Sequence, residues 1–343
     1  MKNNLRNTAL FSLSLLLLIS CSGVKQDVSF FIYNEADTFV SSLMNQIHSD
    51  LNQKGKSFDI SYASLSQVTQ NEQLAQAIEN KSAKVLAVNI VDRLSASSII
   101  TKADAASLPV LFFNRAPLEE DLLAGKSAYY VGTDPTYEGK AQADLAAKLF
   151  GYPSSLSSTY DKNGDGKIQL VILKGEQGHQ DTELRSRYCV TELYNLGYDV
   201  DIIASSYANW TKEEGYEAMK DIYEKYSSQI ELVFCNNDDM AVGALNYLVD
   251  KKAFTKGADI TSQPFPVIGV DATNIGISYI KDGLLYGTIK NDATAQAKAI
   301  AEFISYLSEG KKIDESFPYY GQMADGRTVS VKGITITKKD ITE

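Results

Sequence analysis

Residues 230–237 read "IELVFCNN", a short apolar run that ends in two amides. A run this short and uniformly apolar is typical of a strand buried on both faces of a sheet. Similar runs alternate along the chain with amphipathic stretches such as "TQNEQLAQAIENKS". This βαβ alternation predicts an α/β fold with doubly wound parallel sheets. The other runs are "VSFFIY", "VLAVNIVD", "PVLFFN", "IQLVILKG", "VDIIAS", "FPVIGVD" and "YGTIKN".

The chain has 343 residues, enough for two domains of ordinary size. The alternation breaks near "YYVGTDPTYEGK", so we place a domain boundary there. The C-terminal part still carries a helical pattern, "DATAQAKAIAEFISYLSEG", and a strand-like alternation, "RTVSVKGITI". We expect these last elements to be shared between two sheets.

The N-terminus has the anatomy of a signal peptide, which we assign to residues 1–20: a basic head, an apolar segment and a small residue before Cys21. Its ending, "LISC", resembles the bacterial lipobox, in which the cysteine is lipidated and becomes the first residue after cleavage. Residues 21–27 would then form a lipidated tether. The alternative is an ordinary secretory signal with an incidental cysteine. We expect an exported lipoprotein, anchored in the periplasm or on the cell surface.

Composition excludes some classes of protein. A formal net charge of −10 argues against a nucleic-acid partner. Besides Cys21, the sequence has Cys189 and Cys235, which we interpret as small buried hydrophobic residues rather than a disulfide. No other apolar run is long enough to span a bilayer.

Polar side chains gather directly after the apolar runs, where ligands of open parallel sheets bind. A sugar hydroxyl both donates and accepts hydrogen bonds, so carboxylates, amides and arginine suit it. Phe39 and the single tryptophan, Trp210, could cover the flat faces of a pyranose. The alternative is that these Asn and Asp residues only form turns and helix caps. The residues at these ends are Asp37, Phe39, Asn114, His179, Asp181, Arg185, Asn236, Asn237, Asp238, Asp271, Asn291 and Asp292.

The stretch "DKNGDGKIQ", residues 161–169, resembles the first nine positions of an EF-hand calcium loop. Oxygen-bearing side chains occupy positions one, three, five and nine, Gly166 stands at the sharp turn, and the carbonyl of Lys167 would be the seventh-position ligand. The twelfth position is Ile172 instead of a glutamate. Either the loop is only a turn or its last ligand comes from elsewhere. The side chains concerned are Asp161, Asn163, Asp165 and Gln169.

Six stretches carry a family resemblance over nearly the whole chain after the tether: "NDDMA", "VIGVDA", "GTIKND", "FFNRAP", "AYYVGTD" and "LKGEQGHQDTELR". Together they resemble the galactose/glucose-binding proteins of bacterial sugar ABC transporters, within the periplasmic binding protein type 1 family. The resemblance implies two doubly wound parallel-sheet domains joined by a hinge of three crossings, near Thr133, Asn291 and Ser330. The N-terminal domain would comprise residues 28–133 plus 292–329, and the C-terminal domain residues 134–291 plus 330–343.

The resemblance also implies a function. The chain would be no enzyme but a substrate-binding lipoprotein, a monomer that captures D-galactose or D-glucose between its domains by hinge closure. It would deliver the sugar to a membrane permease, with a chemoreceptor as a further partner. A structural Ca²⁺ would bind the 161–169 loop, with Glu231 supplying the missing carboxylate. The sugar contacts would be Tyr33, Asp37, Phe39, Asn114, His179, Asp181, Arg185, Trp210, Asn237, Asp271 and Asn291.

Two departures from the family pattern, Ala36 and Gln180, fall at the rim of this pocket. The main alternative function is a glycoside-processing hydrolase that uses the cleft carboxylates, although we expect Arg185 and the amides to keep them ionised. A sugar-responsive repressor would need a DNA-binding motif where the export signal stands. Of the two histidines, His48 is predicted to be a surface residue and His179 a ligand contact.

Overall fold

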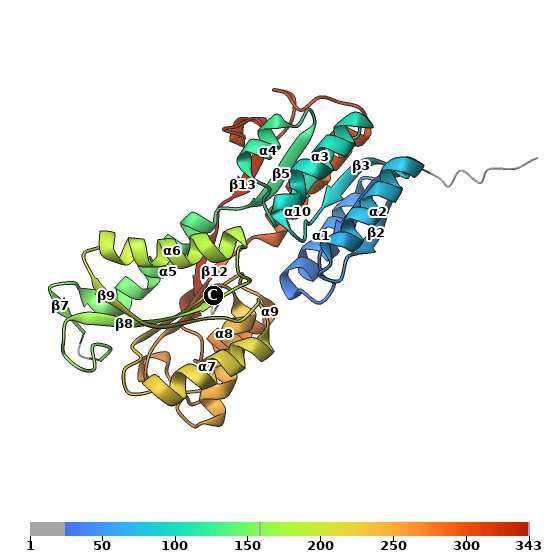
Figure 1. Ribbon diagram of the computed structural model, residues 1–343. Coiled ribbons are helices and arrows are strands. Elements are labelled where there is room, and N and C mark those ends of the chain that lie inside the picture. Colours follow the sequence, from blue (N-terminus) through green and yellow to red (C-terminus); the bar gives the residue numbers. More distant parts are fainter. Residues whose placement is uncertain (1–24, 158, 342–343) are drawn as a thin grey trace, which may run out of the picture.

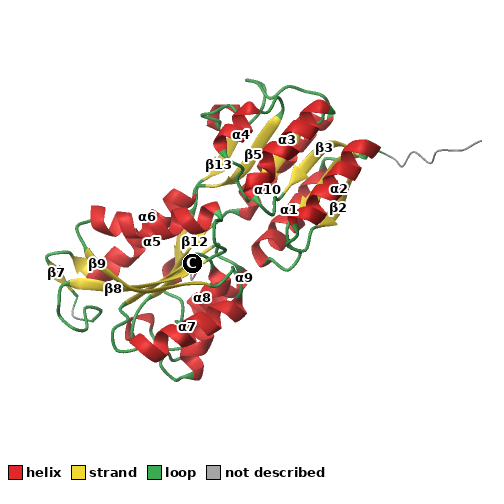
Figure 2. Cartoon of the chain, viewed as in Figure 1, coloured by secondary structure: helices red, strands yellow, loops and turns green. Residues whose placement is uncertain are grey.

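A computed structural model describes residues 25–157 and 159–341, which form two α/β lobes (Figure 1). The signal peptide, Cys21 and most of the tether lie outside the described residues. In each lobe, helices flank a central sheet (Figure 2). No helix in the described part of the chain combines the length and apolar character needed to cross a membrane.

The first lobe is built on a sheet with the strand order β13-β5-β4-β3-β1-β2, in which neighbouring strands pair in parallel. Its strands are β1 (Gln26–Ile32), β2 (Phe58–Tyr62), β3 (Ala83–Val88), β4 (Val110–Phe113), β5 (Ala128–Thr133) and β13 (Thr328–Val331). Its helices are α1 (Thr38–Gln53), α2 (Gln67–Asn80), α3 (Ala96–Ala105), α4 (Glu119–Ala124) and α10 (Ala293–Ser308).

The second lobe has the strand order β14-β12-β11-β10-β8-β9, parallel except that β14 runs antiparallel to β12. Its strands are β8 (Lys167–Lys174), β9 (Asp199–Tyr207), β10 (Leu232–Cys235), β11 (Val267–Val270), β12 (Gly287–Lys290) and β14 (Ile334–Thr337). Its helices are α5 (Pro135–Phe150), α6 (Gln180–Asn195), α7 (Lys212–Tyr226), α8 (Asp238–Asp250) and α9 (Asn274–Lys281). Smaller elements are the hairpin β6 (Gly151–Tyr152) and β7 (Ser155–Leu156), and the 3₁₀ turns η1 (Arg93–Ser95), η2 (Ile260–Ser262), η3 (Tyr320–Gln322) and η4 (Lys338–Ile341).

Successive strand residues enter different cores, which explains the uniformly apolar runs. Phe30 packs in a cluster with α1 and α10, whereas its neighbour Phe31 packs in a cluster with α2 and α3. Val233 and Phe234 divide in the same way between the two cores of the second lobe. Both faces of each sheet are therefore covered, as the runs predicted. The edge strand β9 departs from this rule, because Ile202 is 46% exposed.

The chain passes between the lobes after Thr133, between Lys290 and Ala293, and between Val331 and Ile334. Ser330 itself lies in β13, so the third crossing falls at Lys332 and Gly333. The tail is shared between the two sheets, as expected. Its last strand is antiparallel because β14 enters the second sheet from the crossing, at the end where β12 leaves it, and therefore runs in the opposite direction to β12.

The structure also tests the predictions for the cysteines, the strands and His48. The two cysteines, Cys189 and Cys235, are buried and unpaired within the described chain. The apolar runs identified in the sequence did not include β2 or β5, because polar residues or a glycine interrupt the apolar pattern of these strands. His48 is not a surface residue: it is partly buried and stacks on Phe58 with ring centroids 4.5 Å apart, and burial lowers the pKa of its imidazole.

Candidate ligand-binding site

A narrow pocket lies between the lobes, at the carboxyl ends of strands from both sheets. It brings together the eleven side chains that the sequence predicted as contacts and adds Arg115. About 30 Å³ of it is open to the centres of water-sized molecules. The lining residues are Tyr33, Asp37, Phe39, Asn114, Arg115, His179, Asp181, Arg185, Trp210, Asn237, Asp271 and Asn291.

Three lining residues are also helix caps. Asp37 Oδ1 accepts a hydrogen bond from Val40 N (2.8 Å) at the start of α1, and Asn237 Oδ1 accepts from Met240 N (3.0 Å) at the start of α8. His179 caps α6 through its Nδ1. These residues thus cap helices, as the alternative interpretation of the sequence held. Capping does not exclude them from the site, because it holds each side chain in place at the pocket.

Three residues that line this pocket have a strained backbone. Asn114, Trp210 and Asp271 have φ angles of 61°, 67° and 113°, in the region that side chains other than glycine rarely adopt. Such residues cost about 1–3 kcal/mol each and persist where the surroundings hold them, often at functional sites. Gly175 makes room for the strained Trp210, because a Cβ at Gly175 would lie 2.2 Å from the indole ring.

Trp210 supplies an apolar face and a free polar atom. Its ring meets that of His179 edge to face, with centroids 5.0 Å apart. The indole Nε1 is buried and finds no hydrogen-bond partner among the described residues. A ligand oxygen in the pocket could accept a hydrogen bond from this N–H group, since buried indole N–H groups usually have a partner.

Arg185 is the buried cation of the site. Its Nη2 donates to Asp181 Oδ2 (3.1 Å), its Nη1 to the carbonyl of Asn236 (2.8 Å), and its Nε to Glu138 Oε2 (2.6 Å). A buried charge needs such pairing to remain in the protein interior.

The pKa values of two pocket carboxylates shift in the direction opposite to the one expected. We expected Arg185 to keep them ionised, but burial raises the pKa of Asp181 and raises that of Asp271 well above its ordinary value, with Arg185 only opposing the shift. The reason is the narrow closed pocket, which removes water from both carboxyl groups. Asn291 Nδ2 donates to Asp271 Oδ1 (3.3 Å), which leaves the other oxygen for a ligand.

Arg115 was missed because only the first residue after the strand run "VLFF", Asn114, was considered. The guanidinium stacks on Tyr33, 3.7 Å from the ring centroid, and Nη1 donates to the carbonyl of Val91 (2.9 Å). Its Nη2 donates to Glu176 Oε2 (2.7 Å), which belongs to the other lobe. Arg115 is 5% exposed, and its Nε has no partner among the described residues.

Two side-chain contacts join the lobes beside the pocket. Besides the Arg115–Glu176 pair, Thr38 Oγ1 donates to Asp239 Oδ2 across the cleft (2.7 Å). The cleft is therefore closed, with a lining drawn from both lobes.

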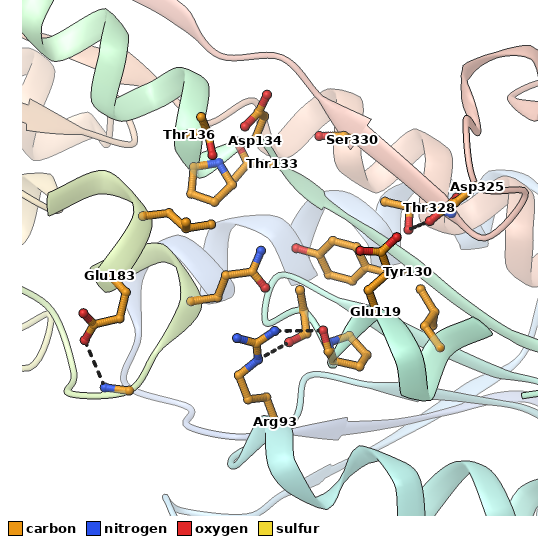
Figure 3. A pocket seen from close by; sticks show the side chains of 17 residues that line it. Arg93, Glu119, Tyr130, Thr133, Asp134, Thr136, Glu183, Asp325, Thr328 and Ser330 are labelled. Atoms are coloured by element: carbon orange, nitrogen blue, oxygen red, sulfur yellow. Dashed lines mark hydrogen bonds between the residues drawn. The ribbon is translucent and has the colours of Figure 1, made fainter. Parts of the chain in front are cut away.

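A wider groove lies on the hinge side of the molecule, with about 550 Å³ open to the centres of water-sized molecules (Figure 3). The hinge residues Thr133, Asp134 and Ser330 line it, together with Arg93. Arg93 is held by the carbonyls of Ala116 and Pro117, both at 3.0 Å. None of the predicted sugar contacts lines this groove.

The loop at residues 161–169 is tied to the strand β10 through Glu231, which is 1% exposed. Glu231 accepts hydrogen bonds from the backbone N–H groups of Lys162 (2.6 Å) and Gln169 (3.2 Å). Asp165 accepts from the N–H of Lys167 (2.9 Å). Two buried oxygens, Asp161 Oδ1 and Gln169 Oε1, have no hydrogen-bond partner within the described chain.

The predicted calcium ligands are only partly assembled around a common point. Burial raises the pKa of Glu231, and the negative charges of Asp161 and Asp165 raise it further. Across residues 25–157 and 159–341, no three or more His, Cys, Asp and Glu side chains form a group that could hold a metal ion. The side chain of Asn163 instead pairs with Asp165.

Comparison with known proteins assigns the fold to a family. The family model described as "Periplasmic binding protein domain" matches residues 28–312. The D-galactose/methyl-galactoside binding periplasmic protein MglB of Haemophilus influenzae is 33% identical over 293 residues, which cover 83% of this chain and 82% of that protein. The ribose import binding protein RbsB of Salmonella typhimurium is 24% identical over 71% of this chain and 72% of its own.

Solved structures share the architecture. A periplasmic solute-binding protein of an ABC transporter from Actinobacillus succinogenes, with bound D-allose, superposes with a TM-score of 0.75 at 20% identity, covering 91% of this chain and 98% of that one. The myo-inositol binding protein of Caulobacter superposes with a TM-score of 0.74 at 20% identity, covering 92% and 94%. These structures support the two-lobed fold, and the family rules out the hydrolase alternative. The chain belongs to the periplasmic binding protein family, whose members bind substrates for transporters and are not enzymes.

Proposed function

We propose that this protein captures one molecule of D-galactose or D-glucose between its lobes and delivers it to the permease of an ABC transporter. The observation that carries the proposal is the composition of the pocket, which unites carboxylates, amides, arginines and aromatic rings from both lobes. Carboxylates accept and arginines donate, so together they meet hydroxyl groups that do both. Phe39 and Trp210 supply faces for the C–H surfaces of a pyranose.

Hinge closure follows from the way the pocket is enclosed. Its lining comes from both lobes, which contact each other beside it, so a sugar would enter while the lobes stand apart. The three crossings near Thr133, Asn291 and Gly333 allow such a rotation. The Thr38–Asp239 and Arg115–Glu176 contacts would then form as the lobes close on the ligand.

The choice of galactose is supported by the name of the Haemophilus influenzae relative, and that of glucose rests on the resemblance of the sequence motifs to galactose/glucose-binding proteins. Other similar proteins carry ribose, allose or myo-inositol in their names or titles. Calorimetric titration of the purified protein with galactose, glucose, ribose, allose and myo-inositol tests the proposal. We expect saturable binding of galactose or glucose that is tighter than that of the other compounds. Preference for another sugar would revise the substrate, and no binding of any of them would overturn the function.

We also propose that Ca²⁺ binds the 161–169 loop. The unpartnered oxygens Asp161 Oδ1 and Gln169 Oε1 fit a cation that prefers oxygen ligands. The residues that would hold it are Asp161, Asn163, Asp165, Gln169, Glu231 and the carbonyl of Lys167. The cation would neutralise the carboxylates and join the loop to β10, which gives it a structural role.

Finally, we propose export to the periplasm or cell surface with an anchor at Cys21, and docking to a chemoreceptor as well as the permease. The anchor rests on the lipobox-like ending "LISC". Cys21→Ser should release the protein from the membrane fraction, because a lipid chain would be its apolar attachment. Membrane association that survives this substitution would instead indicate attachment through another protein.

A further inference from the structure

Glu138 lies behind the pocket and belongs to none of the groups assigned to ligand binding. It stands in the first turn of α5 and is 0% exposed. Both of its carboxylate oxygens are engaged: Oε2 accepts from Arg185 Nε (2.6 Å), and Oε1 accepts from Thr133 Oγ1 (2.5 Å). Burial removes the hydration of this carboxylate, and its two hydrogen bonds must offset that desolvation cost.

The first of these bonds reaches the pocket. Arg185 lines the cavity, and its contacts with Glu138, Asp181 and the carbonyl of Asn236 fix the plane of its guanidinium. Because the guanidinium is planar, these three partners also fix the direction of the other N–H donors of Arg185. Gly139 allows α5 to approach α6 closely here, since a Cβ at Gly139 would lie 2.7 Å from the backbone oxygen of Arg185.

The second bond reaches the hinge. Thr133 ends β5 at the first crossing, and its hydroxyl oxygen lies 3.4 Å from the carbonyl of Val331, which ends β13 beside the third crossing. Thr133 and Ser330 are seen along the hinge-side groove in Figure 3. A Cβ added at Gly333 would lie 3.5 Å from Glu138 Cγ, so the third crossing passes over the same side chain. Thr133 belongs to the first lobe and Glu138 to the second, so their bond spans a crossing.

We propose that Glu138 is a positioning residue that sets the orientation of Arg185 in the pocket and ties this orientation to the hinge crossings at Thr133 and Val331. The inference rests on the proposed sugar-binding function. It predicts that a hydroxyl at the hinge, outside the pocket, affects ligand affinity through Glu138. It also predicts that the affinity depends on the charge of Glu138.

The pH dependence has a defined sign. Burial raises the pKa of Glu138 to about 6, although the charge of Arg185 opposes this shift. Asp181 of α6, Tyr130 of β5 and Asp271 after β11 are the other titratable groups whose charges interact with it. As the pH falls through about 6, Glu138 takes up a proton and Arg185 loses the charge of one of its two carboxylate partners, so sugar affinity should fall. The stability contribution of Glu138 has the opposite sign, because a raised pKa favours folding at low pH and loses that contribution as the pH rises.

The test compares substitutions at Glu138 and Thr133 with a matched control, Thr182→Val. The hydroxyl of Thr182 is buried on α6 without a partner among the described residues, so its removal should leave binding unchanged. Glu138→Ala should weaken binding of galactose or glucose by about tenfold to a hundredfold, as expected for losing a hydrogen bond to a charged group. Glu138→Gln keeps an oxygen for Arg185 but carries no charge, so its affinity should fall toward that of the wild type at low pH and should vary less between pH 5 and pH 8.

Thr133→Val should weaken binding by roughly twofold to tenfold, less than Glu138→Ala, because Thr133 acts on the pocket only indirectly, through one hydrogen bond to Glu138. The same substitution should have no further effect in a Glu138→Ala background, because Thr133 acts through Glu138. Calorimetry gives the affinities, and thermal unfolding confirms that each variant is folded.

Wild-type affinity in a folded Glu138→Ala variant would overturn the inference. If that variant does not fold, the decision falls to Thr133→Val and Glu138→Gln: affinity equal to that of Thr182→Val for the first, or an unchanged pH profile for the second, overturns it. Absence of sugar binding by the wild type would instead overturn the proposed function, and this inference with it.

Discussion

The interdomain pocket and the 161–169 loop are both rich in oxygen, and both combine residues far apart in the sequence, but their hydrogen bonds are distributed differently. In the pocket, helix caps and buried pairs fix the side chains while polar atoms such as Arg115 Nε and Trp210 Nε1 stay unpartnered within the described chain. In the loop, several oxygens accept from the loop's own backbone. The pocket is thus organised ahead of its ligand, whereas the loop would exchange internal hydrogen bonds for a cation.

The comparison teaches that a ligand contributes free energy where it supplies a partner to a buried polar group of its own pocket. An unsatisfied buried donor or acceptor costs about 1–3 kcal/mol, and a ligand that supplies the partner recovers it. The pocket also concentrates strain at Asn114, Trp210 and Asp271, while the positive φ angles of the loop fall on Gly164 and Gly166, which tolerate them. We therefore expect larger effects from substitutions in the pocket than in the loop.

The largest effect is expected at Asp271. Asp271→Ala removes a buried carboxylate from the closed cleft and leaves Asn291 Nδ2 and a sugar hydroxyl without their acceptor. Affinity for galactose or glucose should fall by about 3 kcal/mol or more, within the range of strong hot spots. Calorimetry measures this loss, and Asp221→Ala, on the exposed face of α7, is the control. A loss below about 0.5 kcal/mol, typical of a surface substitution, would place Asp271 outside the binding site.

The next effect is expected at Trp210. Trp210→Ala should weaken sugar binding by about 1–3 kcal/mol, because it removes an aromatic face of the pocket, whereas Trp210→Phe should lose less. Trp210 is the single tryptophan of the chain, so its fluorescence reports on this site alone. Sugar should change the emission saturably, with the dissociation constant found by calorimetry. Binding heat with unchanged emission would show that the indole does not meet the ligand.

A smaller effect, on stability, is expected in the loop. Glu231→Gln leaves one acceptor for the backbone donors of Lys162 and Gln169, so in Ca²⁺ the unfolding free energy should fall by about 1–3 kcal/mol. Chelation should lower the melting temperature of the wild type but not that of Glu231→Gln, with exposed Glu217→Gln as a control that behaves like the wild type. Identical melting curves for wild type with and without chelator would show that the loop is a turn without a cation.

The smallest effect is expected when the two sites are tested against each other. Chelation and Glu231→Gln should change the sugar dissociation constant by less than about twofold, since distant sites with no shared partners act additively. Calorimetry in Ca²⁺ and in chelator measures this. A larger change would mean that the loop and the pocket are coupled, and the distinction between a structural and a functional site would fail.

The sequence by itself determined the fold class and most of the candidate pocket. Strand runs such as "IELVFCNN" identify a sheet covered on both faces, and the parallel direction brings the residues after each run to one edge. Asn114, Asn237 and Asp271 could be selected for this reason, because local position along a strand decides which edge a residue occupies. Their role as sugar contacts stays a prediction until binding is measured.

Only the tertiary structure decided which side chains pair across the fold. Arg115 meets Glu176, Thr38 meets Asp239, and Glu138 links Arg185 to Thr133 through contacts that no local pattern encodes. The antiparallel direction of β14 and the partial burial of His48 likewise depend on what packs against them. The physical reason is that periodicity reports the face a residue presents, whereas pairing, burial and pKa depend on the neighbours that packing brings from distant parts of the chain.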